Sequence, residues 1–412
     1  MSELTYLEKL LDGVKVEWQT LGKVLKRTKG TKITAGQMKA LHKDNAPLKI
    51  FAGGKTVAFV DFKDIPEKDI NREPSIIVKS RGIIEFEYYD KPFSHKNEMW
   101  SYHSNNDAIS IKYIYYFLKI NEGYFQKIGG KMQMPQIATP DTDKFEVPIP
   151  CPDNPEKSLA IQSEIVRILD KFTALTAELT AELTAELNMR KKQYNYYRDQ
   201  LLSFKEGEVE WKALGTICQI GDGNHSSKYP KANEMIEQGI PFIRGTNMVN
   251  GTICNQDMKY ISKEKHNELK KGHLKAFDVL IANRGEVGKV AYVPEGYSGF
   301  NLNSQLAWLR ANPEIIINRY LFFILCSSTI QNKLSGEGGA LQQLTIKNIK
   351  NIQIPVPSIT VQSNIVSFLD KFDSLTNSIS EGLPREIELR QKQYEYYRDL
   401  LFSFPKPDTV SN

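Results

Sequence analysis

The sequence RKKQYNYYRDQLLSF occupies residues 190–204, and a close match, RQKQYEYYRDLLFSF, occupies residues 390–404. Three further matches follow the same order along the chain: IVRILDKF (165–172) with IVSFLDKF (365–372), VEWQTLG (16–22) with VEWKALG (209–215), and VPIPCP (147–152) with IPVP (354–357). Chance does not plausibly produce four ordered matches, so the chain contains an internal duplication. The duplication decides the architecture.

The N-terminal segment resembles the end of a repeated element. Tyr6, Gly13 and Val16-Glu17-Trp18 echo Tyr197, Gly207 and Val209-Glu210-Trp211. The repeat is therefore circular. This predicts a pseudo-two-fold arrangement, in which the N-terminal segment lies near the C-terminal helix.

Residues 155–204 are predicted to form one long helix. No glycine or internal proline interrupts them, and apolar residues recur every three or four positions. Asn154-Pro155 supplies a cap and a first-turn proline, and Gly207 supplies a stop. The same apolar offsets recur from Ile365 onward, which predicts an intramolecular antiparallel coiled coil of the two helices. Gly382-Leu383-Pro384 should break or kink the second helix.

Within the first helix, TAEL is repeated three times over residues 176–187. Leucine at every fourth residue drifts around a helix of 3.6 residues per turn, so the repeat adds little pairing specificity. It does fix length, because each tetrad adds roughly 6 Å. We therefore assign a spacer role to Thr176, Leu179, Leu183 and Leu187.

The blocks between the repeats, residues 19–147 and 212–354, share an outline but little sequence. Short β-branched and aromatic runs alternate with glycine turns, and each block then has an apolar helical stretch. We predict an α+β fold: two similar mixed α/β domains separated by two long antiparallel helices. The predicted parts are 1–18, an N-terminal segment; 19–150, the first domain; 151–208, the central helix; 209–357, the second domain; and 358–412, the C-terminal helix.

Basic and amide side chains gather at the glycine turns of both blocks. Arg, Lys, Asn and Gln can hydrogen-bond base edges, and glycine lets a backbone approach phosphate closely. The candidate DNA contacts are Lys55, Lys79, Arg81, Lys131, Gln133, Arg244, Asn247, Asn283, Arg284, Gln342 and Gln343. Each turn taken singly also fits an ordinary solvated loop. Their recurrence in both blocks is the reason to consider a nucleic-acid role.

Composition and motifs exclude several other classes. The net charge of +5 permits a polyanionic partner without requiring one. The four cysteines form no C-x-x-C pair, and the start of the chain is unlike a signal peptide. Phe51–Thr56 ends like a phosphate loop, but Lys49 stands where that motif needs glycine. We expect a cytoplasmic protein with neither a catalytic nor a metal site.

The repeated segments resemble the specificity subunit (HsdS) of type I restriction–modification enzymes over the whole chain. The resemblance rests on the IPIP and IPVP exits, Gln162 and Gln362, the LDKF motifs, TAEL and RKKQYNYYRDQLLSF, and the last two favour the type IC branch. It implies two target-recognition domains that each read half of a bipartite DNA sequence, across a spacer that we estimate at about seven base pairs. It further implies two methyltransferase subunits (HsdM) and later endonuclease subunits (HsdR). S-adenosylmethionine, ATP and Mg would then belong to those partners, and both methylation and restriction would need this chain.

The repeated helices offer candidate partner contacts, because Tyr and Arg are favoured interface anchors. They are Tyr194, Tyr196, Arg198, Tyr394, Tyr396 and Arg398. For Tyr197 and Tyr397, a place in the coiled-coil core is the preferred interpretation. The alternative function is a non-catalytic scaffold, or a DNA-binding regulator that acts without a methyltransferase.

Overall fold

The computed structural model describes residues 6–130, 134–205, 207–225, 227–335, 343–377 and 382–405. The chain divides into two compact units. Unit 1 comprises Met1–Leu179 with Arg390–Asn412, and unit 2 comprises Thr180–Leu389. Each unit therefore contains one variable block together with parts of the repeated helices. Below, the first domain means β1 to β9 and the second domain means β10 to β20.

The first domain contains two sheets and a short two-stranded ribbon. The main sheet has the order β2-β8-β5-β6 and the small sheet the order β4-β3-β7, in which only β3 and β7 are parallel. The ribbon pairs β1 with β9. The strands are β1 Val16–Thr20, β2 Lys26–Arg27, β3 Leu48–Phe51, β4 Val57–Val60, β5 Ser75–Lys79, β6 Glu85–Tyr89, β7 Phe93–His95, β8 Trp100–His103 and β9 Glu146–Pro150.

The second domain repeats this topology with a different sequence. Its main sheet has the order β11-β19-β16-β17, its small sheet β15-β12-β18 again has one parallel pair, and β10 pairs with β20. The strands are β10 Glu210–Ala213, β11 Cys218–Asp222, β12 Ile240–Ile243, β13 Met248–Val249, β14 Thr252–Ile253, β15 Lys259–Ile261, β16 Val279–Ala282, β17 Val290–Tyr292, β18 Asn301–Leu302, β19 Leu306–Ala311 and β20 Gln353–Val356. The predicted pair of similar α/β domains is confirmed.

The helices of the two domains also correspond, since each domain places two successive helices after its main sheet. In the first domain the helices are α2 Leu21–Val24, α3 Ala35–Leu41, η1 Phe62–Asp64, η2 Glu67–Asp69, α4 Ile111–Ile120, α5 Glu122–Gly129 and α6 Thr139–Asp143. In the second they are α8 Leu214–Ile217, η3 Ala232–Glu234, η4 Gly245–Asn247, α9 Lys263–Glu268, η5 Glu295–Tyr297, α10 Asn318–Cys326, α11 Ser328–Ser335 and α12 Ile346–Asn351. The remaining helices are α1 Tyr6–Leu11, α7 Pro155–Leu201, α13 Ile359–Asn377 and α14 Gly382–Leu401.

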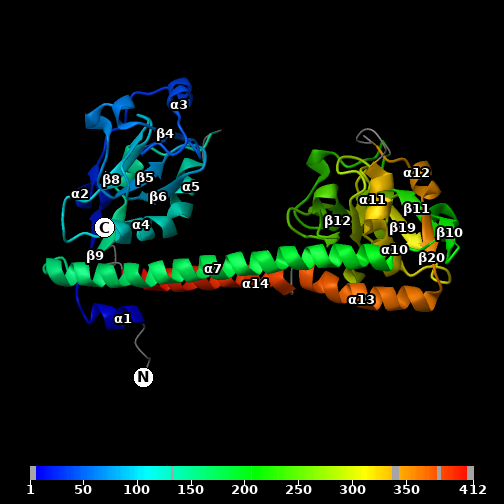
Figure 1. Ribbon diagram of the computed structural model, residues 1–412. Coiled ribbons are helices and arrows are strands. Elements are labelled where there is room, and N and C mark those ends of the chain that lie inside the picture. The colour runs from blue at the N-terminus through cyan, green and yellow to red at the C-terminus, as the bar shows by residue number, and fades with distance from the viewer. Residues whose placement is uncertain are drawn as a thin grey trace. The chain divides into compact units, whose positions relative to one another are not determined.

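Strand β5 shows why the domain has layers. All five of its residues are buried, and its alternating side chains enter two different clusters. Ile76 and Val78 pack with α4, whereas Ile77 packs with Phe51 and Phe93 of the small sheet. The pleat of a strand sends neighbouring residues to opposite faces, so one apolar strand joins both layers. Helix α4 lies between the main sheet and α7, as Figure 1 shows.

The long helix α7 begins as the sequence predicts. The Asn154 side chain accepts a hydrogen bond from the Lys157 N–H at 3.0 Å, and Pro155 occupies the first turn. The helix ends at Leu201, three residues before the predicted Phe204, and Gly207 follows with φ +85°. In place of one second helix the structure has two: α13 ends at Asn377, and α14 begins at the predicted glycine, Gly382, which has φ +77°.

The repeated helices pair with each other inside each unit. In unit 1 the Phe172 ring stacks on Tyr397 at 5.7 Å, and the Thr173 hydroxyl is 3.0 Å from the Tyr394 hydroxyl. In unit 2 Tyr197 meets Phe372 at 5.8 Å. Residue numbers rise along one helix as they fall along the other, so the predicted antiparallel pairing is confirmed. Tyr197 and Tyr397 are nevertheless 42% and 39% exposed, so they lie at the margin of the seam.

Both domain cores are completed by residues of these helices. The core of the first domain includes the start of α7 and the segment that ends α14; the residues are Ile161, Ile165, Leu169, Leu401, Phe402 and Phe404. The core of the second domain includes the end of α7 and the middle of α13; the residues are Tyr194, Leu202, Ile365 and Leu369. Each core thus contains residues of two repeated helices, one from its own half of the duplication and one from the other half.

The N-terminal helix α1 belongs to unit 1 and lies against α7 on the side away from α4 (Figure 1). The Tyr6 hydroxyl donates to the Glu164 carboxylate at 3.1 Å, and Leu7 and Leu11 are buried in the same cluster as Leu401. The segment therefore packs where α7 begins and α14 ends.

Two fully buried glutamines, one in α7 and one in α13, hydrogen-bond the backbone of the adjacent domain. Gln162 accepts from the Ser110 N–H at 2.9 Å and donates to the Ala108 carbonyl at 3.0 Å. Gln362 makes the equivalent pair, accepting from the Ile317 N–H at 2.9 Å and donating to the Ile315 carbonyl at 3.0 Å. One amide can satisfy a buried donor and a buried acceptor at once, so neither glutamic acid nor alanine can replace it.

We predict that Gln162→Ala lowers the free energy of unfolding by about 2–4 kcal/mol, because two buried backbone groups lose their partners. Gln162→Glu should cost a similar amount, since it loses the donor and buries a charge. Urea unfolding followed by circular dichroism measures both effects. The control is Gln200→Ala, which removes an exposed side chain of α7 and should change stability by less than about 0.5 kcal/mol. Equal losses in the Ala variants would contradict the locking role.

Candidate nucleic-acid interface

The two domains present an arginine at the same place in their topology. Arg81-Gly82 lies in the turn between β5 and β6, and Arg284-Gly285 lies in the turn between β16 and β17. Both glycines have positive φ, +77° and +75°, a conformation that disfavours side chains. Both arginines are exposed, and within the described residues neither side chain has a hydrogen bond or an ion pair. Each turn therefore presents an exposed guanidinium at the surface.

The same backbone contact supports each arginine turn. It comes from the segment that follows α5 in the first domain and α11 in the second. In the first domain Arg81 forms a bridge with Gln136, and Ile137 N–H donates to the Ser80 carbonyl at 3.0 Å. In the second domain Arg284 forms a bridge with Gln343, and Leu344 N–H donates to the Asn283 carbonyl at 2.8 Å. These bonds fix the turns on rigid elements, which makes them suitable for reading a groove.

Lys79, by contrast, forms ion pairs inside the domain. Its ammonium lies 2.6 Å from Glu85 and 2.8 Å from Glu87, and the residue is 8% exposed. Burial lowers the pKa of Lys79, but the hydrogen bonds to Glu85 and Glu87 outweigh burial and leave that pKa above its ordinary value. The side chain stays charged and is paired with these two carboxylates, so it does not project from its turn as Arg81 does.

Three candidates of the second domain support their turns instead of projecting from them. Asn247 is 1% exposed; it accepts from the Arg244 N–H at 3.1 Å and donates to the Gln256 carbonyl at 3.1 Å. The half-buried Arg244 donates to the Asp257 carbonyl at 2.6 Å. Asn283 is 4% exposed and donates to Asp222 at 3.2 Å, placing its neighbour Arg284 at the surface.

The remaining candidates fall into two groups. Lys55 is exposed in the turn between β3 and β4, and Gln343 is exposed beside Arg284. Lys131, Gln133 and Gln342 lie outside the described residues. The arginine turns are thus the part of the predicted set that the structure repeats in both domains, and the role of every candidate in DNA binding stays a prediction.

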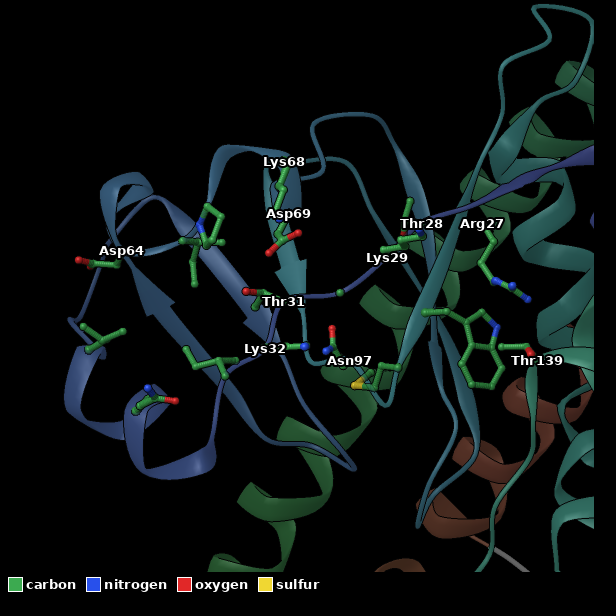
Figure 2. A pocket seen from close by; sticks show the side chains of 18 residues that line it. Arg27, Thr28, Lys29, Thr31, Lys32, Asp64, Lys68, Asp69, Asn97 and Thr139 are labelled. Atoms are coloured by element: carbon green, nitrogen blue, oxygen red, sulfur yellow. The ribbon is translucent and has the colours of Figure 1, made fainter.

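Sequence reasoning missed a basic cleft in the first domain. It has a volume of about 930 Å³, and its lining includes Arg27, Lys29, Lys32 and Lys68 (Figure 2). Arg27 is paired with Asp143 at 2.6 Å, whereas the three lysines have no ion pair within the described part of the chain. The signal in the sequence is the basic run RTKGTK (27–32), which itself contains no apolar side chain.

The predicted partner contacts on the repeated helices divide by burial. Tyr196 and Tyr396 are 61% and 64% exposed, and both stand at equivalent positions of the repeat. Tyr194 is buried in the second domain's core, and the buried Arg198 lies over its ring at 5.6 Å. Tyr394 and Arg398 are half-buried, and Arg398 is 2.8 Å from Asp399. Of these six residues, Tyr196 and Tyr396 therefore offer the most exposed aromatic surface.

Over the described ranges, no group of three or more His, Cys, Asp or Glu side chains is arranged to hold a metal ion. In the same part of the chain, no helix has the length and apolar character needed to cross a membrane.

Comparison with known proteins gives a consistent result. The family model for the type I restriction modification DNA specificity domain matches the chain twice, over residues 15–189 and 206–389. The chain is 43% identical to the specificity subunit of the type I restriction enzyme EcoR124I/EcoR124II of Escherichia coli, covering 100% of both chains. It is 37% identical to the EcoprrI specificity subunit of Escherichia coli, covering 92% of this chain and 93% of that one.

A solved structure supports the fold independently. Its title describes the structural basis of complex assembly and conformational transition of the type I R-M system. The TM-score is 0.60 at 15% identity, and the match covers 94% of this chain and 97% of that chain. At this identity the likeness concerns the fold.

We predict that Arg81→Ala and Arg284→Ala each weaken binding of the DNA target by about 1–3 kcal/mol, or roughly 5- to 150-fold, because each removes a side chain able to read a base edge. Thermal stability should not change, since both side chains are exposed. Fluorescence anisotropy and thermal melts measure the two effects. Lys79→Ala is the matched control: it should lower stability, because Glu85 loses its cation and Glu87 keeps only Lys49. Unchanged DNA affinity in both arginine variants would refute the assignment.

Proposed function

The chain belongs to the DNA specificity subunits of type I restriction–modification systems, which have no catalytic activity of their own, and we propose that each of its two domains reads one half of a bipartite DNA target. The specificity role is that of the family. The division of the target between the domains is our proposal.

The observation that carries the proposal is the paired arginine turn. The two main sheets share a strand order, β2-β8-β5-β6 and β11-β19-β16-β17, while their sequences differ. Each places one exposed arginine, which has no ion pair among the described residues, between its third and fourth strands. A shared frame with divergent surface residues suits two readers that bind the same kind of ligand, duplex DNA, at different sequences.

We further propose that the length of the helical repeat sets the gap between the half-sites. The TAEL segment lies inside the uninterrupted helix α7, and Leu179, Leu183 and Leu187 are all half-buried there. Because these leucines are only half-buried, they favour a role in setting the length of α7 over a role in helix pairing. Three tetrads add roughly 18 Å of axial rise. Our estimate for the unspecified gap is about seven base pairs.

The proposed partners are two methyltransferase subunits (HsdM), joined for restriction by endonuclease subunits (HsdR). Support comes from Tyr196 and Tyr396, because two equivalent exposed tyrosines suit two copies of one partner. Methyl transfer and strand cleavage would then occur on those subunits, together with S-adenosylmethionine, ATP and Mg²⁺. We propose a cytoplasmic location, where bacterial DNA and these partners are found.

The alternative is a scaffold or a regulator that acts without a methyltransferase. It makes a different prediction for cells that produce this chain together with a methyltransferase subunit. A specificity subunit directs methylation to one bipartite sequence, and a scaffold leaves the methylation pattern unchanged. Sequencing of modified adenines distinguishes the two.

We predict that deletion of Thr184–Leu187 shortens the unspecified gap of the methylated sequence by about one to two base pairs. The deletion removes roughly 6 Å of helix and about 40° of rotation, against 3.4 Å and roughly 35° per base-pair step. Both half-sites should stay the same. Sequencing of methylated adenines measures half-sites and gap together.

The matched control keeps the length of α7 and changes its side chains. Thr184→Ala combined with Leu187→Ala leaves a helix of equal length, so the gap should stay as in the unaltered chain. A changed half-site after the deletion, or a changed gap in the control, would contradict the proposal that helix length sets the spacing.

A further inference from the structure

We propose that the cleft of the first domain is a clamp for the phosphate backbone of DNA, in which Lys29, Lys32 and Lys68 bind phosphates and read no sequence. The inference rests on the proposed function and extends it, because it assigns a second kind of DNA contact to residues outside the arginine turns. Its ligand is the phosphodiester backbone beside the half-site that the first domain reads.

The cleft is built where residues 27–32 cross from β2 toward α3. Thr31 N–H donates to the His95 carbonyl at 2.8 Å, and the Thr28 hydroxyl lies 3.0 Å from His95 Nε2. His95 is fully buried, and burial lowers its pKa. The segment is thereby held against β7 by one bond to the His95 backbone and one to its buried side chain.

Gly30 shows how close that contact is. A Cβ on Gly30 would lie 2.5 Å from the His95 carbonyl oxygen and 2.6 Å from its Nδ1. No other residue fits without moving the segment away from β7. Thr31 is buried, whereas Lys29 and Lys32 on either side of Gly30-Thr31 are exposed. The backbone is thus fixed in a way that turns two lysines outward.

The third lysine comes from a different part of the domain. Lys68 lies in η2, and Figure 2 shows it across the cleft region from Lys32, with Lys29 on the same segment as Thr31. The three lysines therefore line one cleft from two elements that are distant in sequence. Among the described residues none of them has an ion pair.

The remaining lining is mixed, because apolar side chains such as Ile33, Leu41 and Trp100 stand beside polar ones. Thr28, Thr139 and Asn97 supply neutral polar groups, and the acidic residues are Asp64 and Asp69. Asp64 already accepts a hydrogen bond from the Asp61 N–H at 3.1 Å. Lysine is a flexible point charge that binds phosphate without the fixed geometry needed to recognise a base. Duplex DNA presents one charge per roughly 1.7 Å of its axis, so several lysines can be engaged together.

The test uses the full chain in complex with its methyltransferase subunits. Two short duplexes of equal length serve as probes: one carries the methylated sequence mapped for the unaltered complex, and the other is a random sequence. Binding is measured by fluorescence anisotropy across a salt series. The variants are the triple Lys29→Gln/Lys32→Gln/Lys68→Gln and the charge-conserving triple Lys29→Arg/Lys32→Arg/Lys68→Arg.

The Gln triple should weaken binding of both duplexes alike and make the slope of log affinity against log salt shallower by about 2.7, or roughly 0.9 for each phosphate contact. The Arg triple should keep the slope of the unaltered complex. Lys91→Gln, an exposed charge that does not line the cleft, should change neither. Asp69→Asn removes an acidic group from the cleft and should tighten binding of both duplexes. The methylated sequence should be the same for all variants.

An unchanged slope in the Gln triple would overturn the clamp. So would weakened binding of the target duplex alone, because that result assigns the lysines to base reading. Failure of the proposed function looks different: the unaltered complex would then bind both duplexes equally and methylate no defined bipartite sequence.

Discussion

Each domain core of this protein is closed by residues from both repeated helices. Ile161 and Leu169 of α7 meet Leu401 and Phe402 in one core, and the end of α7 meets Ile365 and Leu369 of α13 in the other. Neither half of the duplication can bury its own apolar surface alone. The antiparallel pairing of the helices follows from this exchange, because each domain must receive the start of one helix and the end of the other.

This constraint separates the parts that must stay the same from the parts that are free to vary. Gln162 and Gln362 satisfy backbone groups in both domains, so they do not depend on the sequence of either block. The arginine turns and the lysine cleft lie outside the helix contacts. A recognition surface can therefore change without altering the frame that supports it. That division suits a DNA specificity subunit.

The repeated helices could be predicted from the sequence, but the exposed residues of the two domains could not. Repeats, the Asn154 cap and the Gly382 break all act locally along the chain, so the helices could be predicted. Burial depends on residues far apart in sequence, and for this reason Lys79 and Asn283 could not be distinguished from Arg81 and Arg284. The cleft could not be predicted, because residues 27–32 and Lys68 come together only in the folded domain. The equivalence of the two arginine turns likewise emerges from strand order.

The central claim is that two independent readers share one frame. Replacing residues 19–147 with the corresponding block of another specificity subunit tests it most directly, because that exchange keeps α7, α13 and α14 intact. Sequencing of methylated adenines should then show one new half-site, with the other half-site and the gap between them unchanged. A change in both half-sites would contradict the account.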